Sequence, residues 1–126
     1  MYEIRLGIPE IEALWLELST KFEQGHLSKD ETVLYKKWGK AMALIAANPR
    51  HPGLKSHEIE PLSHRYGIKV WQSYLENNTP GAGRLYWVYG PDRQSITIIG
   101  LEPHPEDKKK SGYTKIRLSA LGEKES

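Results

Sequence analysis

The chain has 126 residues, a formal net charge of +2 at pH 7 and no cysteine. This length fits one domain with a hydrophobic core, and the lack of cysteine excludes disulfides, thiolate metal sites and a cysteine nucleophile. The net charge is too small to indicate nucleic-acid binding by itself, although the positive excess lies in the second half of the chain. We expect residues 1–126 to form one cytoplasmic domain with a frayed end at 122–126, since no segment reads as a signal peptide or a membrane span.

The first half of the chain predicts a short strand and two helices. Residues 2–6 alternate between apolar and polar side chains, which is typical of a strand. Apolar residues at helical spacing fill residues 9–25, and a second helix begins at Ser28, where Glu31 completes a capping box. The second helix ends at residues 48–49, an Asn-Pro pair. Two amphipathic helices joined by a short turn predict an antiparallel hairpin with one face for a sheet.

The second half predicts strands joined by tight turns. A polar connector over residues 50–66 contains prolines and a glycine, and we expect it to be irregular. Strand patterns follow at residues 68–75, 84–89 and 95–101, and residues 113–118 suit a short strand or a helical turn. Turns this short join antiparallel strands most simply. The expected fold is therefore α+β: an N-terminal strand, a two-helix hairpin and an antiparallel β-meander, with the helices packed on one face.

Short motifs accompany this order of elements. Asn48-Pro49-Arg50 closes the second helix, Gly53-Leu54-Lys55 lies in the connector, and Ile98-Ile99-Gly100-Leu101 leads into a charged segment. The strand Gly83-Arg84-Leu85-Tyr86-Trp87-Val88 has an arginine, an aliphatic residue and then aromatic residues. In these motifs and in its topology, over nearly the whole chain, the sequence resembles the RelE/ParE toxin superfamily of type II toxin–antitoxin modules.

The resemblance implies a RelE-like toxin that cleaves mRNA in the ribosomal A site, by attack of the RNA 2′-hydroxyl and without a metal or other cofactor. The ParE branch of the superfamily implies a different activity, inhibition of DNA gyrase. Both branches are normally neutralised by a cognate antitoxin. The expected partners are therefore an antitoxin protein, mRNA and the ribosome, with no membrane, and a homodimer is a further option. A degenerate relative that only binds an antitoxin, or an unrelated α+β binding domain, stays open as an alternative.

Three residues are candidates for catalysis. Arg84 suits a phosphate clamp, because its planar guanidinium matches phosphate geometry and it matches the toxins' strand arginine. His104, held between two prolines, suits a general acid or base, and Tyr113 suits stacking on a base or orienting the phosphate. The structural alternatives are an arginine at a strand start, a loop histidine and a tyrosine capping the core.

The lysines suit an accessory role in RNA binding, because cations near a cleavage site raise its affinity for phosphate. The candidates are Lys55, Lys108, Lys109 and Lys110. The run of three lysines at 108–110 is first of all typical of a solvated, charged loop. The histidines do not fall at metal-ligand spacing with carboxylates, so the sequence predicts no metal site.

The general base is left open by the sequence. Related toxins often carry lysine or arginine in the strand before the arginine strand, but this chain has Trp71-Gln72-Ser73 there. Remaining candidates for the base are Glu58, Glu102 and His57. The missing basic residues also favour the non-catalytic alternative.

Overall fold

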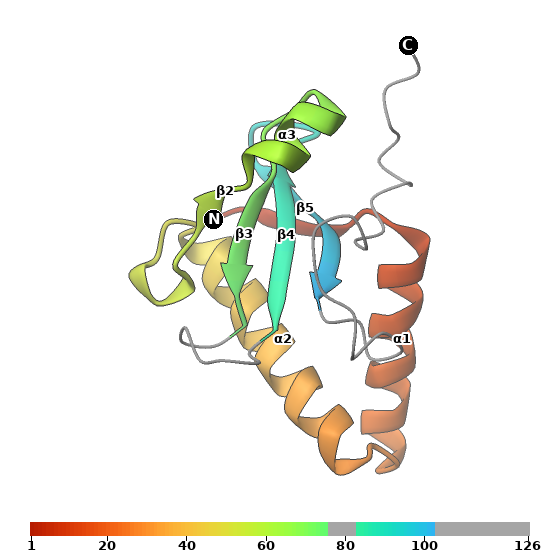
Figure 1. Cartoon of the computed structure of the whole chain (residues 1–126). Helices are drawn as coiled ribbons and strands as arrows, with labels where there is room; N and C mark the ends of the chain where they lie inside the picture. Colours follow the sequence, from red (N-terminus) through yellow and green to blue (C-terminus); the bar gives the residue numbers. More distant parts are fainter. Residues whose placement is uncertain (76–82, 103–126) are drawn as a thin grey trace.

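The computed structural model describes residues 1–75 and 83–102. Within these ranges the chain is α+β, with a short strand, two long helices and then the remaining strands of a five-stranded sheet (Figure 1). No helix among the described residues is long and apolar enough to cross a membrane. The elements are β1 (Glu3–Leu6), α1 (Pro9–Gln24), α2 (Lys29–Ala47), the 3-10 turn η1 (Pro52–Leu54), β2 (His57–Glu58), α3 (Glu60–Tyr66), β3 (Trp71–Tyr74), β4 (Arg84–Tyr89) and β5 (Ser95–Glu102).

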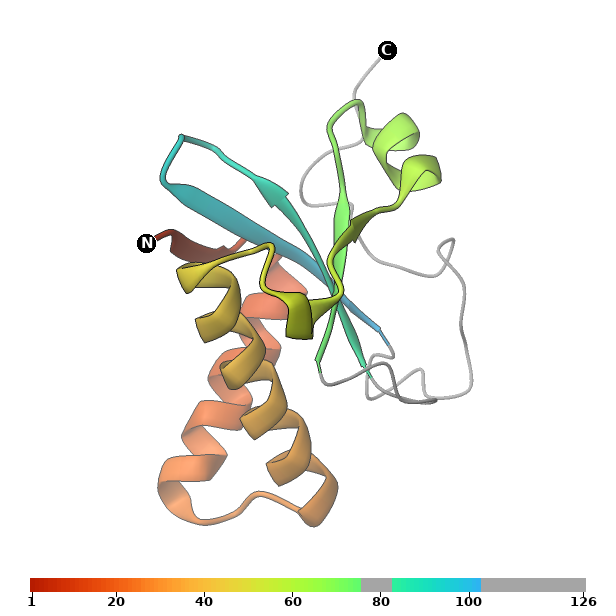
Figure 2. The same ribbon diagram turned by 90° about the vertical axis from the view of Figure 1, so that its left-hand side faces the viewer.

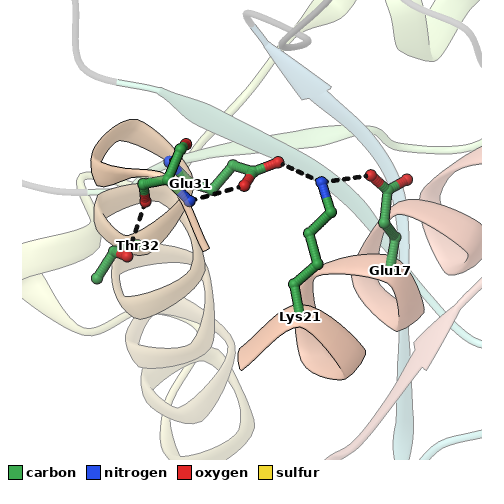
Figure 3. Close-up of polar contacts among 5 residues, drawn as sticks. Glu17, Lys21, Glu31 and Thr32 are labelled. Atoms are coloured by element: carbon green, nitrogen blue, oxygen red, sulfur yellow. Dashed lines mark hydrogen bonds and ion pairs between the residues drawn. The ribbon is translucent and has the colours of Figure 1, made fainter. Parts of the chain in front are cut away.

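Helices α1 and α2 form the expected hairpin, and the turn between them is held by polar contacts (Figure 3). The predicted capping box is confirmed: Ser28 Oγ accepts the Glu31 N–H at 3.1 Å, and Glu31 Oε1 accepts the Ser28 N–H at 2.9 Å. The other oxygen of Glu31 pairs with Lys21 Nζ at 2.9 Å, and Lys21 also pairs with Glu17 at 3.1 Å. One lysine of α1 is thereby tied to the first turn of α2.

The hairpin and the sheet share one hydrophobic core. Trp15 of α1 meets the rings of Tyr35 and Trp38 of α2 at centroid distances of 4.8 and 4.9 Å. Trp38 and Ile45 are fully buried in the same cluster as the inner strands of the sheet. Each such side chain stabilises the fold by roughly 1.5–3 kcal/mol through burial alone. Figure 2 shows α1 and α2 together on one side of the sheet, with α3 away from them beside β3.

The sheet is mixed, whereas the sequence predicted an antiparallel meander after an N-terminal strand of unspecified pairing. Its strand order is β1-β5-β4-β3-β2. Strands β3, β4 and β5 pair antiparallel as expected, and β2, which was not predicted, pairs antiparallel with β3. The pairing that the sequence did not specify is at the edge of the sheet, where β1 pairs parallel with β5. Ile4 and Leu6 of β1 lie opposite Ile96 and Ile98 of β5. This pairing lets β1 extend the apolar surface under the helices, and it leaves β5 buried along its whole length.

The connector over residues 50–66 is more regular than predicted. It contains η1, the short edge strand β2 and the helix α3. The sequence signal that was missed is the pair Ile59 and Leu62, which are both buried and anchor α3 against the core. Strand β3 begins at Trp71, later than the expected residue 68. The expected element at 113–118 and the frayed end at 122–126 lie outside the described residues.

Replacement of Glu31 by glutamine is expected to destabilise the fold in a pH-dependent way. The N–H of Ser28, and then Lys21, lower the pKa of Glu31 below its ordinary value of 4.5. A lowered folded-state pKa means that the ionised carboxylate stabilises the fold above pH 4.5, and that this contribution is lost as the pH falls through the folded-state pKa. Chemical denaturation should show Glu31→Gln less stable than wild type at pH 7, with the difference shrinking well below pH 4.5. The control is Glu23→Gln, an exposed carboxylate of α1. A difference that does not change with pH contradicts the prediction.

Candidate functional site

Polar side chains of four strands gather on one face of the sheet, which we call the polar face. Directly paired residues of antiparallel strands point to the same side, and so do residues two apart along a strand. One row across the strands runs from His57 to Gln72 and Tyr86, and the next from Tyr74 to Arg84 and Glu102. The polar face consists of His57, Gln72, Tyr74, Arg84, Tyr86 and Glu102.

The opposite face of the sheet is the one that meets the end of α2. Ser73 points to this face, and its Oγ accepts the indole N–H of Trp87 at 2.8 Å. The same Oγ lies 2.7 Å from Ser56 Oγ, which donates to the carbonyl of Pro49. Pro49 lies two residues beyond the end of α2, after the capping residue Asn48. The long helices and their connector therefore take the Trp87 face, and the polar face lies on the other side.

Glu102 lies at the β5 end of the second row and contacts two residues of β4. Its Oε1 accepts a hydrogen bond from Tyr86 Oη at 2.8 Å and pairs with Arg84 Nη1 at 3.2 Å. The Glu102 side chain is only 8 % exposed, against 38 % for Arg84. Gly100 lies opposite Tyr86, and because it has no side chain the tyrosine can reach past it to Glu102. The result is a buried carboxylate held between a phenol and a partly exposed guanidinium.

The surroundings of Arg84 keep it charged. Burial, the largest single influence, lowers the pKa of Arg84, but the combined attraction of Tyr86 and Glu102 outweighs burial and raises that pKa above its ordinary value. The guanidinium carbon lies 5.8 Å from the ring centre of Tyr74. The Arg84 Nε is buried and has no hydrogen-bond partner. The guanidinium therefore binds one carboxylate and still has N–H groups to offer an anion.

The first row ends in an exposed histidine and a buried amide. Gln72 Nε2 lies 3.4 Å from His57 Nε2, and His57 Nδ1 lies 3.0 Å from the carbonyl oxygen of Lys55. The side-chain oxygen of Gln72 is buried and has no hydrogen-bond partner.

Of the predicted site residues, Arg84 and Lys55 lie within the described ranges. Arg84 lies on the polar face between Tyr74 and Glu102, and its role as a phosphate-binding residue stays a prediction. Lys55 is exposed in a left-handed conformation with φ 52° after η1, and only its carbonyl contacts the polar face, through His57. The other predicted residues lie outside the described ranges, so their distances to Arg84 are not defined; they are His104, Tyr113, Lys108, Lys109 and Lys110.

The three candidates for the general base do not all lie on the same face of the sheet. Glu58 lies directly opposite Trp71, so its side chain belongs to the face that meets the end of α2. Glu102 and His57 both belong to the polar face, and Glu102 alone is in contact with Arg84. Tyr86 was missed by the sequence reasoning, although its position two residues after Arg84 could have placed it on the same face.

An open depression of about 810 Å³ lies elsewhere, beside α3. It is lined by the carboxylates Glu58 and Glu60 but also by Lys69 and His64, so its charges point to no single class of ligand. Among the described residues, no three His, Asp or Glu side chains are grouped as metal ligands would be. Comparison with family models, curated proteins and solved structures finds no match to this chain.

Removal of the Tyr86 hydroxyl is expected to destabilise the fold. In Tyr86→Phe the buried carboxylate of Glu102 loses the hydrogen bond that Tyr86 Oη donates at 2.8 Å, and a hydrogen bond to a charged group contributes roughly 1.5–3 kcal/mol. Urea denaturation should show a lower midpoint with an unchanged slope. The control is Tyr89→Phe on the same strand, whose exposed side chain should change stability by no more than about 0.5 kcal/mol. Equal effects of the two variants would show that the Tyr86–Glu102 bond does not stabilise the fold.

Proposed function

We propose that this chain is a toxin-like endoribonuclease of the RelE/ParE superfamily, which cleaves mRNA in the ribosomal A site. The observation that carries the proposal is the buried carboxylate of Glu102 in contact with Arg84 on the sheet face away from α1 and α2. An ionised carboxylate can accept a proton, and a guanidinium can bind a phosphate. Their contact brings together two of the groups that RNA cleavage by the 2′-hydroxyl requires.

The proposed reaction needs only groups of the chain and the RNA itself. Glu102 takes the proton of the 2′-hydroxyl, and the 2′-oxygen attacks the adjacent phosphorus atom. A 2′,3′-cyclic phosphate forms as the bond to the 5′-oxygen breaks, and His104 gives that oxygen a proton. Arg84 stabilises the charge that develops on the non-bridging oxygens. In this scheme Tyr86 positions Glu102, and Tyr113 stacks on a base.

The fold supports the same proposal in a coarser way. The order of strand, two-helix hairpin and later strands is the order that the resemblance implies, and the predicted arginine strand is β4. The proposed partners follow from the superfamily: a cognate antitoxin, mRNA and the ribosome.

A second function is favoured by the same ion pair. Glu102 neutralises part of the charge of Arg84. A guanidinium that is already paired has less charge to offer a phosphate, which suits a non-catalytic relative, such as a ParE-like gyrase inhibitor or a protein that only binds an antitoxin. The two functions can be distinguished by testing whether Glu102 takes part in RNA cleavage.

Expression of the wild-type chain in a bacterial host is expected to arrest growth, with primer extension showing cuts within translated codons. Glu102→Gln should lower the cleavage rate by about 10²- to 10⁴-fold, which is the usual loss when a general base is removed. Arg84→Ala should also relieve the arrest. The matched control is Glu58→Gln, because that carboxylate belongs to the opposite face of the sheet, and it should cleave as the wild type does.

Two results would overturn the ribonuclease proposal, and a third would change its mechanism. Intact mRNA together with loss of DNA supercoiling would assign the chain to the gyrase branch. Normal growth on expression would assign it to the antitoxin-binding alternative. Arrest by Glu102→Gln as strong as that by the wild type, with the same cuts, would remove Glu102 from the mechanism.

A further inference from the structure

The amide of Gln72 is the one group of the polar face whose burial the proposed reaction does not explain. Gln72 is only 2 % exposed, and its side-chain oxygen has no hydrogen-bond partner. A buried acceptor left without a donor is unfavourable, because the water that it gave up on folding is not replaced. Such a group is often found where a ligand supplies the missing partner.

The neighbouring histidine decides which end of the amide is unpaired. His57 Nδ1 is 3.0 Å from a carbonyl oxygen, which can only accept, so in the neutral ring Nδ1 carries the proton. His57 Nε2 is then an acceptor, and it faces the Nε2 donor of Gln72 at 3.4 Å. This contact fixes the amide with its oxygen as the unpaired end. The missing partner must therefore be a donor.

The position of Gln72 relative to Arg84 shows what kind of donor this is. Gln72 is paired with Tyr86, and Arg84 lies two residues from Tyr86 on the same face. Diagonal neighbours of this kind are roughly 7–8 Å apart. Arg84 Nε is a second buried group without a partner, and it is a donor that suits an anion. The face thus offers an anion site and, one diagonal step away, a site for an N–H donor.

We infer that Gln72 is a base-recognising residue, which accepts a hydrogen bond from an amino or imino N–H of a nucleobase whose phosphate lies at Arg84. A phosphate and a base of one nucleotide are separated by a ribose, which suits a diagonal step better than direct contact. The inference rests on the proposed function for its choice of a nucleotide as the ligand. It assigns Gln72 a role in selecting the substrate and none in proton transfer.

The test compares nucleotides that differ in a single donor. Binding of the four common nucleoside 3′-monophosphates, of purine riboside 3′-monophosphate and of ribose phosphate is measured by NMR titration of the full chain. Purine riboside has no N–H on its base. At least one common nucleotide should bind the wild type about three- to tenfold more tightly than purine riboside does, as one hydrogen bond allows.

Gln72→Met should remove this difference, because methionine has a similar length and no acceptor oxygen of this kind, while the affinity for ribose phosphate stays unchanged. Gln24→Met, at the exposed end of α1, is the matched control and should keep the difference. Because the comparison with purine riboside uses the wild type, equal affinities would overturn the inference even if Gln72→Met fails to fold.

The outcomes separate this inference from the proposed function. If mRNA is cleaved but the wild type binds purine riboside 3′-monophosphate as tightly as every common nucleotide, Gln72 does not recognise a base and the ribonuclease proposal stands. If Gln72→Met keeps the wild-type preference, the inference also fails. If the wild type cleaves no mRNA and binds no nucleotide, both are wrong.

Discussion

The end of the sheet and the proposed site both depend on one buried negative charge, the carboxylate of Glu102 at the end of β5. A carboxylate that is 8 % exposed is tolerated only when other groups replace the water it has lost. Tyr86 and Arg84 replace part of that water, and both come from the neighbouring strand β4. The last two strands are therefore joined by side chains as well as by their backbone ladder. Substitution of any of these three residues is therefore expected to change both the stability of the fold and the geometry of the proposed site.

The two faces of the sheet have different roles. The Trp87 face is mostly apolar, with Ser56, Ser73 and Glu58 as exceptions, and it packs against the helices. The polar face carries the paired ionisable groups Arg84 and Glu102. The strand register creates this division, because alternate residues of β3 and β4 point to opposite sides. It also explains why Glu58, a carboxylate close in sequence to His57, belongs to a different surface.

Much of the fold follows from local patterns. Helix bounds were predictable because Ser28 and Glu31 form a capping box and helical spacing is strong in both helices, and the strands of the meander followed from their turns. The parallel pairing of β1 with β5 was not predictable, because residues 3–6 and 95–98 carry no signal for their register. Arg84 could be predicted as a site residue from its strand motif. Its ion pair with Glu102 could not be predicted, because that contact depends on the register between β4 and β5. Gln72 gave no signal, since an unpaired buried amide is a property of the folded sheet and not of the sequence.

The contact of Arg84 and Glu102 is either a structural ion pair or part of a reactive centre. Measurement of the cleavage rate distinguishes these two roles most directly. The measurement is the single-turnover rate of mRNA cleavage on the ribosome as a function of pH, for the wild type and for Glu102→Gln with its folding checked by circular dichroism. If Glu102 is the base, the wild-type rate rises from acid pH as a carboxyl group ionises, and the folded variant is slow and lacks that rise. A folded variant with the wild-type rate and pH profile would show that the ion pair serves the fold alone.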